Sequence, residues 1–234
     1  MRFLMCFLLT IVSFTLYSND TVLFFEDFNN LDSWKSIKLP LAKNPSQYSI
    51  ITDNDQHYLK AYSKNAASSL QSQVVFNVYQ YPVVKWRWKI DRVLDKGDVT
   101  KKNGDDYPIR IYINFVYKKE MNHPGFAFKH NFVKATYGLE IPRYSLNYII
   151  ESKNQKKVFY DNPFDPDDSK IIIKRSSQES VSIWFDESIN IVEDFKKAFG
   201  FDPPLEAYVA IMCDTDNTGE EVSAYIDYVG VYKE

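Results

Sequence analysis

Carboxylate side chains gather in two short polar segments of the chain, and the first precedes a hydrophobic strand. It contains Asp98, Asp105 and Asp106, and the strand that follows carries Arg110 and Tyr112 on its polar side. Paired carboxylates beside an arginine can bind sugar hydroxyls, hold a cation, or share a proton for acid–base chemistry. The simpler interpretation is a solvated acidic turn with Arg110 as its counter-charge.

The second polar segment lies between two expected strands and contains Asp214, Asp216 and Asn217, followed by Gly219. Oxygen ligands at alternate positions before a sharp-turn glycine match the first half of an EF-hand calcium loop. Tyr225 stands where the closing glutamate would be, which excludes an EF-hand. The alternatives are a Ca²⁺ site completed from elsewhere and a plain hairpin turn. The completing ligands considered are Glu26, Asp27 and Asp227.

The remaining candidates for a ligand surface are aromatic. Trp86 and Trp88 alternate with lysine and arginine, which predicts that they lie in the core. Trp34 and Trp184 lie near segment ends and are the better candidates for an exposed platform. The three histidines show no metal-ligand spacing, and no nucleotide-binding or serine-hydrolase motif is present.

Two-residue alternation of apolar and polar side chains predicts the elements that position these groups. Alternate residues from Val84 to Ile90 and from Ile109 to Phe115 are apolar, as in half-buried antiparallel strands. One helix is expected over 191–199, with Asn190 as its cap. The chain is therefore expected to be an all-β, two-sheet jelly-roll-like sandwich with one short helix, and a closed barrel is the lesser alternative. The other expected strands are 21–26, 47–52, 57–62, 70–78, 144–150, 169–175, 180–185, 206–213 and 222–232.

The first 18 residues have the pattern of a secretory signal peptide, with Arg2 before an apolar run of about 15 residues. The rest, 19–234, is expected to be one domain without a membrane span. Cys213 then has no partner for an internal disulfide and is expected to be a buried apolar side chain. The net charge of −3 and the absence of basic clusters argue against a nucleic-acid partner.

Several separated motifs occur in one order along the chain. They are WRWKI at 86–90, GD at 97–98, GDD at 104–106, RIYINF at 110–115, LNY at 146–148, the segment 194–200, and MCDTDNTG at 212–219. Together they resemble a bacterial family known as domain of unknown function 3047, over about 23–232.

This resemblance implies an exported single domain, with a jelly-roll sandwich like those of carbohydrate-binding modules and lectins. It also implies that one site is shared by six residues, namely Asp105, Asp106, Arg110, Asp214, Asp216 and Asn217. The chain departs from the family pattern at Ile149 and Ile150, where a tryptophan is usual, and in the extended stretch 118–137. A binding surface that used that tryptophan would be altered here.

The sequence therefore favours an exported, non-catalytic binding domain of the periplasm or cell exterior that recognises a glycan. In this hypothesis Arg110, Tyr112 and Asp105 or Asp106 contact the ligand, and Asp214, Asp216 and Asn217 hold Ca²⁺. One alternative is a polysaccharide-degrading enzyme: a glycosidase with two of these carboxylates, or a lyase with Arg110, Tyr112 and His130. A structural or adhesive envelope protein is the third, and the oligomeric state is left open.

Overall fold

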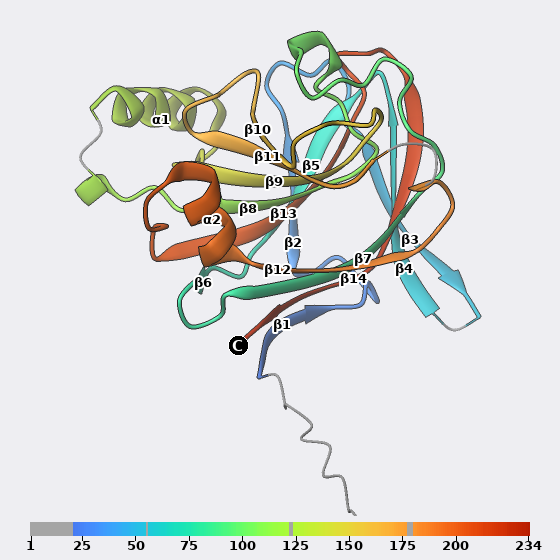
Figure 1. Ribbon diagram of the computed structural model, residues 1–234, viewed down its shortest axis with the longest axis horizontal. Helices are drawn as coiled ribbons and strands as arrows, with labels where there is room; N and C mark the ends of the chain where they lie inside the picture. Colours follow the sequence, from blue (N-terminus) through green and yellow to red (C-terminus); the bar gives the residue numbers. More distant parts are fainter. Residues whose placement is uncertain (1–20, 55, 122–123, 177–179) are drawn as a thin grey trace, which may run out of the picture.

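The computed structural model describes residues 21–54, 56–121, 124–176 and 180–234, and its strands form two sheets packed face to face (Figure 1). The fold is thus the predicted β-sandwich. The predicted signal peptide, 1–18, lies outside the described residues, as does His123. Within the described part of the chain, no helix combines the length and the apolar character needed to cross a membrane.

Sheet A contains both ends of the described chain, because its first strand pairs with its last strand. In Figure 1 the C-terminus accordingly lies beside β1. The long last strand is also hydrogen-bonded to strands on both of its sides. In spatial order the sheet consists of β12 (Phe185–Asn190), β7 (Val83–Ile90), β14 (Glu221–Tyr232), β4 (Gln56–Lys64) and β3 (Gln47–Asp53), with β1 (Val22–Glu26) also paired to β14.

Sheet B is antiparallel except where β9 and β11 pair in parallel. Its central strands are β13 and β8. In spatial order it consists of β10 (Phe159–Asp161), β11 (Ser169–Ser176), β9 (Tyr144–Glu151), β8 (Arg110–Phe115), β13 (Glu206–Asp214), β5 (Ala67–Ser72) and β2 (Trp34–Lys38), with β6 (Phe76–Asn77) also paired to β13.

The alternation in the sequence correctly predicts which side chains form the core between the sheets. Trp86 and Trp88 of sheet A are fully buried and meet edge to face, with ring centroids 5.3 Å apart. Ile111 and Ile113 of sheet B are also fully buried in the same cluster. Burying side chains of this size contributes about 1.5–3 kcal/mol each. The core therefore fixes the register of both sheets and, with it, the residues on their outer faces.

The strand predicted over 180–185 is wrong, because β12 begins where that range ends. The error has a physical cause in Glu187, which is buried although it is charged. Its carboxylate accepts a hydrogen bond of 2.9 Å from Arg175 Nε and lies 3.5 Å from Lys174 Nζ. A neutralised glutamate can occupy an inward position that a search for apolar alternation rejects. The predicted strand 70–78 is divided into β5 and β6, and the short strands β2 and β10 were not predicted.

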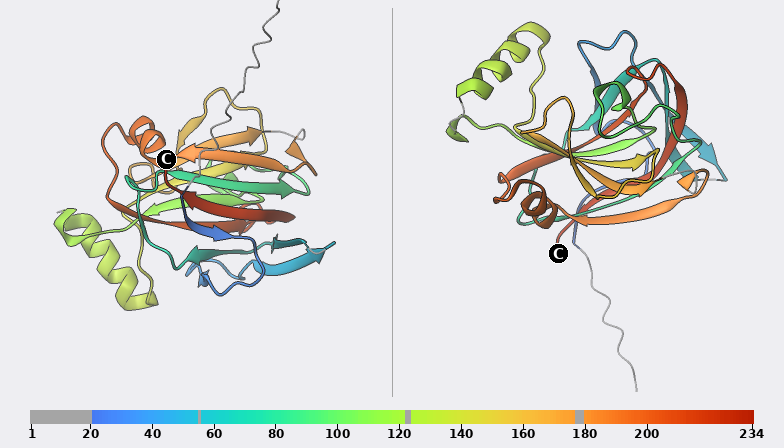
Figure 2. Two further views of the ribbon diagram at one scale, coloured as in Figure 1. Left: turned by 90° about the horizontal axis from the view of Figure 1, so that it is seen from below. Right: turned by 45° about the horizontal axis from the view of Figure 1, so that its top comes forward.

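The predicted helix over 191–199 is confirmed as α2 (Ile191–Phe199). Asn190 Oδ1 accepts hydrogen bonds from the backbone N–H groups of Val192 and Glu193, and Gly200 ends the helix with φ 81°. The expectation of a single helix is wrong, because α1 (Pro124–Tyr137) stands at the margin of the sandwich (Figures 1 and 2). Two short 3₁₀ turns, η1 (Lys102–Gly104) and η2 (Lys119–Met121), are also present.

The sequence hid α1 because its apolar residues do not lie on one face. Phe126 and His130 are buried, whereas Phe128 and Phe132 are 76% and 57% exposed. Apolar residues on opposite sides of a helix cancel the periodic signal by which amphipathic helices are found.

Candidate functional site

Arg110 lies at the centre of a buried ionic cluster on the outer face of sheet B. Its guanidinium donates to both carboxylate oxygens of Asp214, with Nε 2.9 Å from Oδ1. It also donates to Asp105, to Oδ1 at 3.3 Å and to the carbonyl oxygen at 2.5 Å. Arg110 is thus held by four hydrogen bonds to two acidic residues and serves mainly to join them.

Asp106 joins the same cluster to the turn that follows β13. Its fully buried carboxylate accepts hydrogen bonds from Asn217 Nδ2 at 2.9 Å and from the Thr218 backbone N–H at 2.6 Å. Gly219 adopts φ 71° in this turn, a left-handed conformation that favours glycine. The structure thus brings all six residues of the expected shared site together in space. We call Arg110, Asp105, Asp106 and Asp214 the ionic cluster.

Three carboxylates of this region are close enough to share one cation. Oxygen atoms of Asp106, Asp214 and Asp216 all lie within 4.8 Å of one another. Two oxygens on opposite sides of Ca²⁺ are separated by about 5 Å, so the spacing fits that ion. Neither Glu26 nor Asp227 completes this group. Glu26 instead accepts from Trp34 Nε1 at 2.9 Å, and Asp227 accepts from Arg87 at 3.1 Å.

Burial makes two carboxylates of the cluster, those of Asp105 and Asp214, harder to ionise. Burial and the neighbouring charges of Asp106 and Asp105 raise the pKa of Asp214 to about 7, although Arg110 opposes them. Burial likewise raises the pKa of Asp105, again against Arg110. Several negative charges around one arginine leave an excess of negative charge, which protons or a cation can offset. Burial also raises the pKa of the Cys213 thiol, so this side chain is the buried, unreactive group that was expected.

Residues 98–108, here called the cover segment, hold the cluster against sheet B. Val99 and Tyr107 of this segment pack with Ile149 and Ile171 in a second small apolar core. The backbone of this segment approaches itself so closely at Gly104 that only glycine fits there. A Cβ at this position would lie 2.8 Å from the Asp98 backbone nitrogen. Arg110 thus lies on the outer face, as predicted, but it is only 2% exposed because this segment covers it.

Four strands of sheet B carry a set of neutral polar side chains in two adjacent rows, three of them half-buried and three buried. In one row, hydrogen-bond register aligns Gln71 with Ala210, Ala210 with Tyr112, and Tyr112 with Asn147. The next row aligns Tyr208, Asn114 and Ser145. All six polar residues belong to the outer face, because the residues between them are core residues. We call Gln71, Tyr112, Asn147, Tyr208, Asn114 and Ser145 the polar face.

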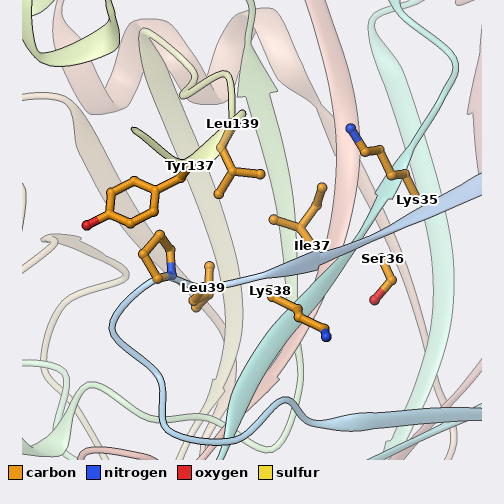
Figure 3. Close-up of a pocket in the computed structure, with 8 residues that line it drawn as sticks. Lys35, Ser36, Ile37, Lys38, Leu39, Tyr137 and Leu139 are labelled. Carbon is orange, nitrogen blue, oxygen red and sulfur yellow. The ribbon is translucent and has the colours of Figure 1, made fainter. Parts of the chain in front are cut away.

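Two hollows flank the polar face. A hollow of about 450 Å³ lies at the edge strand β2, where Tyr137 and Leu139 approach Ile37 and Leu39 (Figure 3). It adjoins the polar face through Lys35, which is paired in register with Gln71. On the opposite side, Ser145 lines a smaller hollow of about 190 Å³. Its other lining residues include Phe126, Lys129, Arg143, Asp165 and Asp168.

Neither tryptophan that the sequence suggested as an exposed platform is freely exposed. Trp34 is buried, and Trp184 is half-buried on the outer face of sheet A. The Trp184 ring meets Tyr58 edge to face at 5.7 Å and lies 4.9 Å from Lys89 Nζ. A lysine of the chain itself therefore already occupies the space beside this ring.

Of the polar face, only Tyr112 was a site candidate from the sequence, and Asn147 is the missed residue that left the clearest signal. Its LNY motif indicated only a strand, because a polar residue between two apolar ones is what a half-exposed strand requires. The signal that could have found it is the continuous apolar run after it, which is typical of a strand covered on both faces.

Comparison with known proteins gives one family. The family model described as "Protein of unknown function (DUF3047)" matches residues 32–230, which confirms the resemblance drawn from the motifs. A search of the curated proteins gave no match.

Among solved structures, three illustrate what the chain is similar to. A family 30 carbohydrate-binding module of Clostridium thermocellum shares 12% identity over 86% of this chain and 92% of its own, with a TM-score of 0.43. Endoglucanase 3 of Trichoderma harzianum shares 5% identity over 93% and 99%, with a TM-score of 0.41. Winged bean acidic lectin shares 8% identity over 86% and 98%, with a TM-score of 0.38. Likenesses this distant say nothing about a ligand or an activity of this chain.

Proposed function

The chain belongs to the DUF3047 family, and we propose that it is an exported, non-catalytic binding domain that recognises a glycan on the polar face of sheet B. The observation that carries this proposal is the composition of that face. Its six side chains are amides, hydroxyls and phenols without a formal charge, although an ordinary solvated sheet face is rich in lysine and glutamate. Neutral donors and acceptors are what the hydroxyl groups of a sugar require.

The placement of the polar face suits an extended ligand. It lies between the hollow beside β2 and the hollow beside Ser145. Strands β2, β5, β13 and β8 are successive neighbours in this sheet. At about 4.8 Å per strand spacing, they span about 14 Å across the strands. A short oligosaccharide can therefore lie across these strands and contact the half-buried Gln71, Tyr112 and Asn114.

In this proposal the ionic cluster positions the site and does not contact the ligand. It fastens the cover segment to the turn after β13 through Arg110 and Asp106. We further propose that Ca²⁺ binds to Asp106, Asp214 and Asp216 and offsets their excess negative charge. Asp216 is the exposed member, so it is the ligand that an incoming ion meets first.

Binding is tested by native affinity electrophoresis of residues 19–234 in gels that contain β-glucan, galactomannan, dextran or polygalacturonate. We expect a neutral polysaccharide to retard the protein and Gln71→Ala with Asn114→Ala to abolish the retardation. Gln47→Ala is the matched control, because it truncates a glutamine on the outer face of sheet A, where Gln47 pairs with Tyr62. Free migration of the wild type in every gel, or equal losses in both variants, would contradict the proposal.

The calcium proposal is tested with two variants that the structure separates. Asp216→Asn is expected to remove the rise in Tm that Ca²⁺ gives and to leave the Tm in chelator unchanged. Asp214→Asn is expected to lower the Tm in both buffers, because Asp214 is also the partner of Arg110. A wild-type Tm that is the same in calcium and in chelator would refute this role.

The alternative functions correspond to distinct results of the same experiments. Release of shorter fragments from a retained polysaccharide would indicate an enzyme. The carboxylates of the ionic cluster are poor candidates for that chemistry, because Asp106 and Asp214 are at most 1% exposed and each of their oxygens already accepts a hydrogen bond. Saturable binding to a purified envelope protein, with no glycan retained, would indicate the adhesive alternative.

A further inference from the structure

Asn147 has a side chain that the fold buries without satisfying. It is fully buried on the outer face of β9. Neither its Nδ2 nor its Oδ1 has a hydrogen-bond partner among the residues that the structure describes. A buried amide without partners destabilises a fold, and almost every buried polar group in a protein avoids that state. A leucine would fill the same space without this cost.

The surroundings of Asn147 are apolar on one side and polar on the other. Ile171 lies beside it in register on β11 and packs with Tyr107 of the cover segment. The Tyr107 hydroxyl is also buried and also lacks a partner in the described part of the chain. Two unpaired polar groups therefore adjoin the same isoleucine. On the other side, the residue in register with Asn147 is Tyr112 of β8.

The nearest cation on the outer face of these strands is already paired. Arg110 is held by four hydrogen bonds to Asp105 and Asp214 and is only 2% exposed. An ionised ligand group that enters a buried site requires an opposite charge there. The amide of Asn147 can instead offer two N–H donors and one carbonyl acceptor. Adjacent hydroxyl groups of a neutral sugar can accept hydrogen bonds from these N–H groups and donate one to the carbonyl oxygen.

We infer that Asn147 is the specificity-determining residue of the polar face and selects a neutral, hydroxyl-rich glycan over an acidic one. This inference rests on the proposed function. Of the residues beside Asn147 in register, Ile171 is buried and Tyr112 reaches solvent. In this inference a ligand hydroxyl approaches the amide from the side of Tyr112. A site built to hydrogen-bond a hydroxyl discriminates strongly against ligands that leave its polar groups unpaired.

The test replaces the amide by an apolar side chain of similar size. In Asn147→Leu, the dissociation constant for whichever of β-glucan, galactomannan or dextran retains the wild type is expected to rise roughly 10- to 100-fold, as the loss of two or three hydrogen bonds requires. The Tm of this variant is expected to stay equal or to rise, because unpaired polar groups are removed. Ile171→Val is the matched control, since it alters the same spot without touching the amide, and its affinity is expected to be unchanged.

The outcomes separate this inference from the proposed function. Retention of the wild type with equal affinity in Asn147→Leu would overturn the role of Asn147 and leave the binding face intact. A lower Tm with unchanged affinity would show that the amide is structural only, which also overturns the inference. Tighter binding of the wild type to polygalacturonate than to the neutral polymers would refute the neutral-ligand assignment. Retention by no polymer would refute the proposed function itself.

Discussion

The outer faces of the two sheets arise from similar sequences but present opposite environments. On sheet A, Arg87 pairs with Asp227 at 3.1 Å and its side chain is 38% exposed. On sheet B, Arg110 is likewise an outward residue of a strand with alternating polarity. Yet it is 2% exposed and hydrogen-bonded to Asp105 and Asp214. The difference comes from the cover segment, which packs over one sheet and has no counterpart on the other among the described residues. Removing the charge of an outward residue should therefore change the free energy of unfolding little on sheet A and strongly on sheet B.

The largest expected effect on stability comes from removing the buried arginine of sheet B. Arg110→Met leaves Asp105 and Asp214 buried without their partner, and removing one member of a buried ion pair costs about 3–5 kcal/mol. Arg87→Met removes an exposed pair and should cost less than about 1 kcal/mol. Urea unfolding of both variants measures the difference. Similar losses in the two would show that the two faces are energetically alike.

The pH dependence of stability sharpens the comparison next. The folded pKa of Asp214, about 7, lies above the ordinary value of about 3.9, so the native state binds the extra proton. The free energy of unfolding should therefore fall as pH rises from about 4 to about 7, by at most about 1.4 kcal/mol per pH unit. Unfolding in urea across this range should show the slope in the wild type and a weaker one in Asp214→Asn. If Asp214→Asn kept the wild-type slope, the pH dependence would come from groups other than Asp214.

A smaller effect is expected at the junction of the cover segment with the turn after β13. Asp106→Ala removes the acceptor of the Asn217 amide and the Thr218 backbone N–H, which should cost about 1.5–3 kcal/mol. Asp186→Ala, on the exposed face of sheet A, should cost less than about 1 kcal/mol. Thermal unfolding by circular dichroism compares the two. If Asp186→Ala lowered the stability as much as Asp106→Ala, the junction would contribute no more than an exposed ion pair.

The smallest expected effect concerns the exposed face itself. Lys89→Gln removes an ammonium group that lies 4.7 Å from the Tyr225 ring and 4.9 Å from the Trp184 ring. Cation–π contacts at partly exposed sites contribute about 0.5–1 kcal/mol. Chemical denaturation should resolve a change of this size, with Lys60→Gln of the same face as the control. A loss above about 2 kcal/mol would mean that this face is as tightly coupled as the ionic cluster.

The sequence was sufficient where one local rule determines the outcome. The alternation around Trp86 and Trp88 predicted the buried face of β7, and Asn190 with Gly200 predicted the ends of α2. Each of these signals lies within a few residues of the element that it specifies. The sequence was insufficient where distant parts of the chain decide, as for Glu187, whose burial depends on Arg175.

The same limit applies to the candidate site. The two acidic segments could be recognised, and their convergence followed from the resemblance to a family. Their burial could not be predicted, because it depends on how Tyr107 and Val99 pack over β9 and β11. The polar face was missed for the same reason: its residues come from four strands that are distant in sequence. Only sheet register reveals that they are neighbours.

The position of β14 has a consequence for biosynthesis. This strand, the last of the chain, hydrogen-bonds to β7, β4 and the first described strand, β1. Sheet A therefore cannot close until residues 221–232 have been synthesised, and contacts so distant in sequence form slowly. A growing chain that lacks β14 leaves β1 without its partner and leaves β4 and β7 each without one of their neighbours.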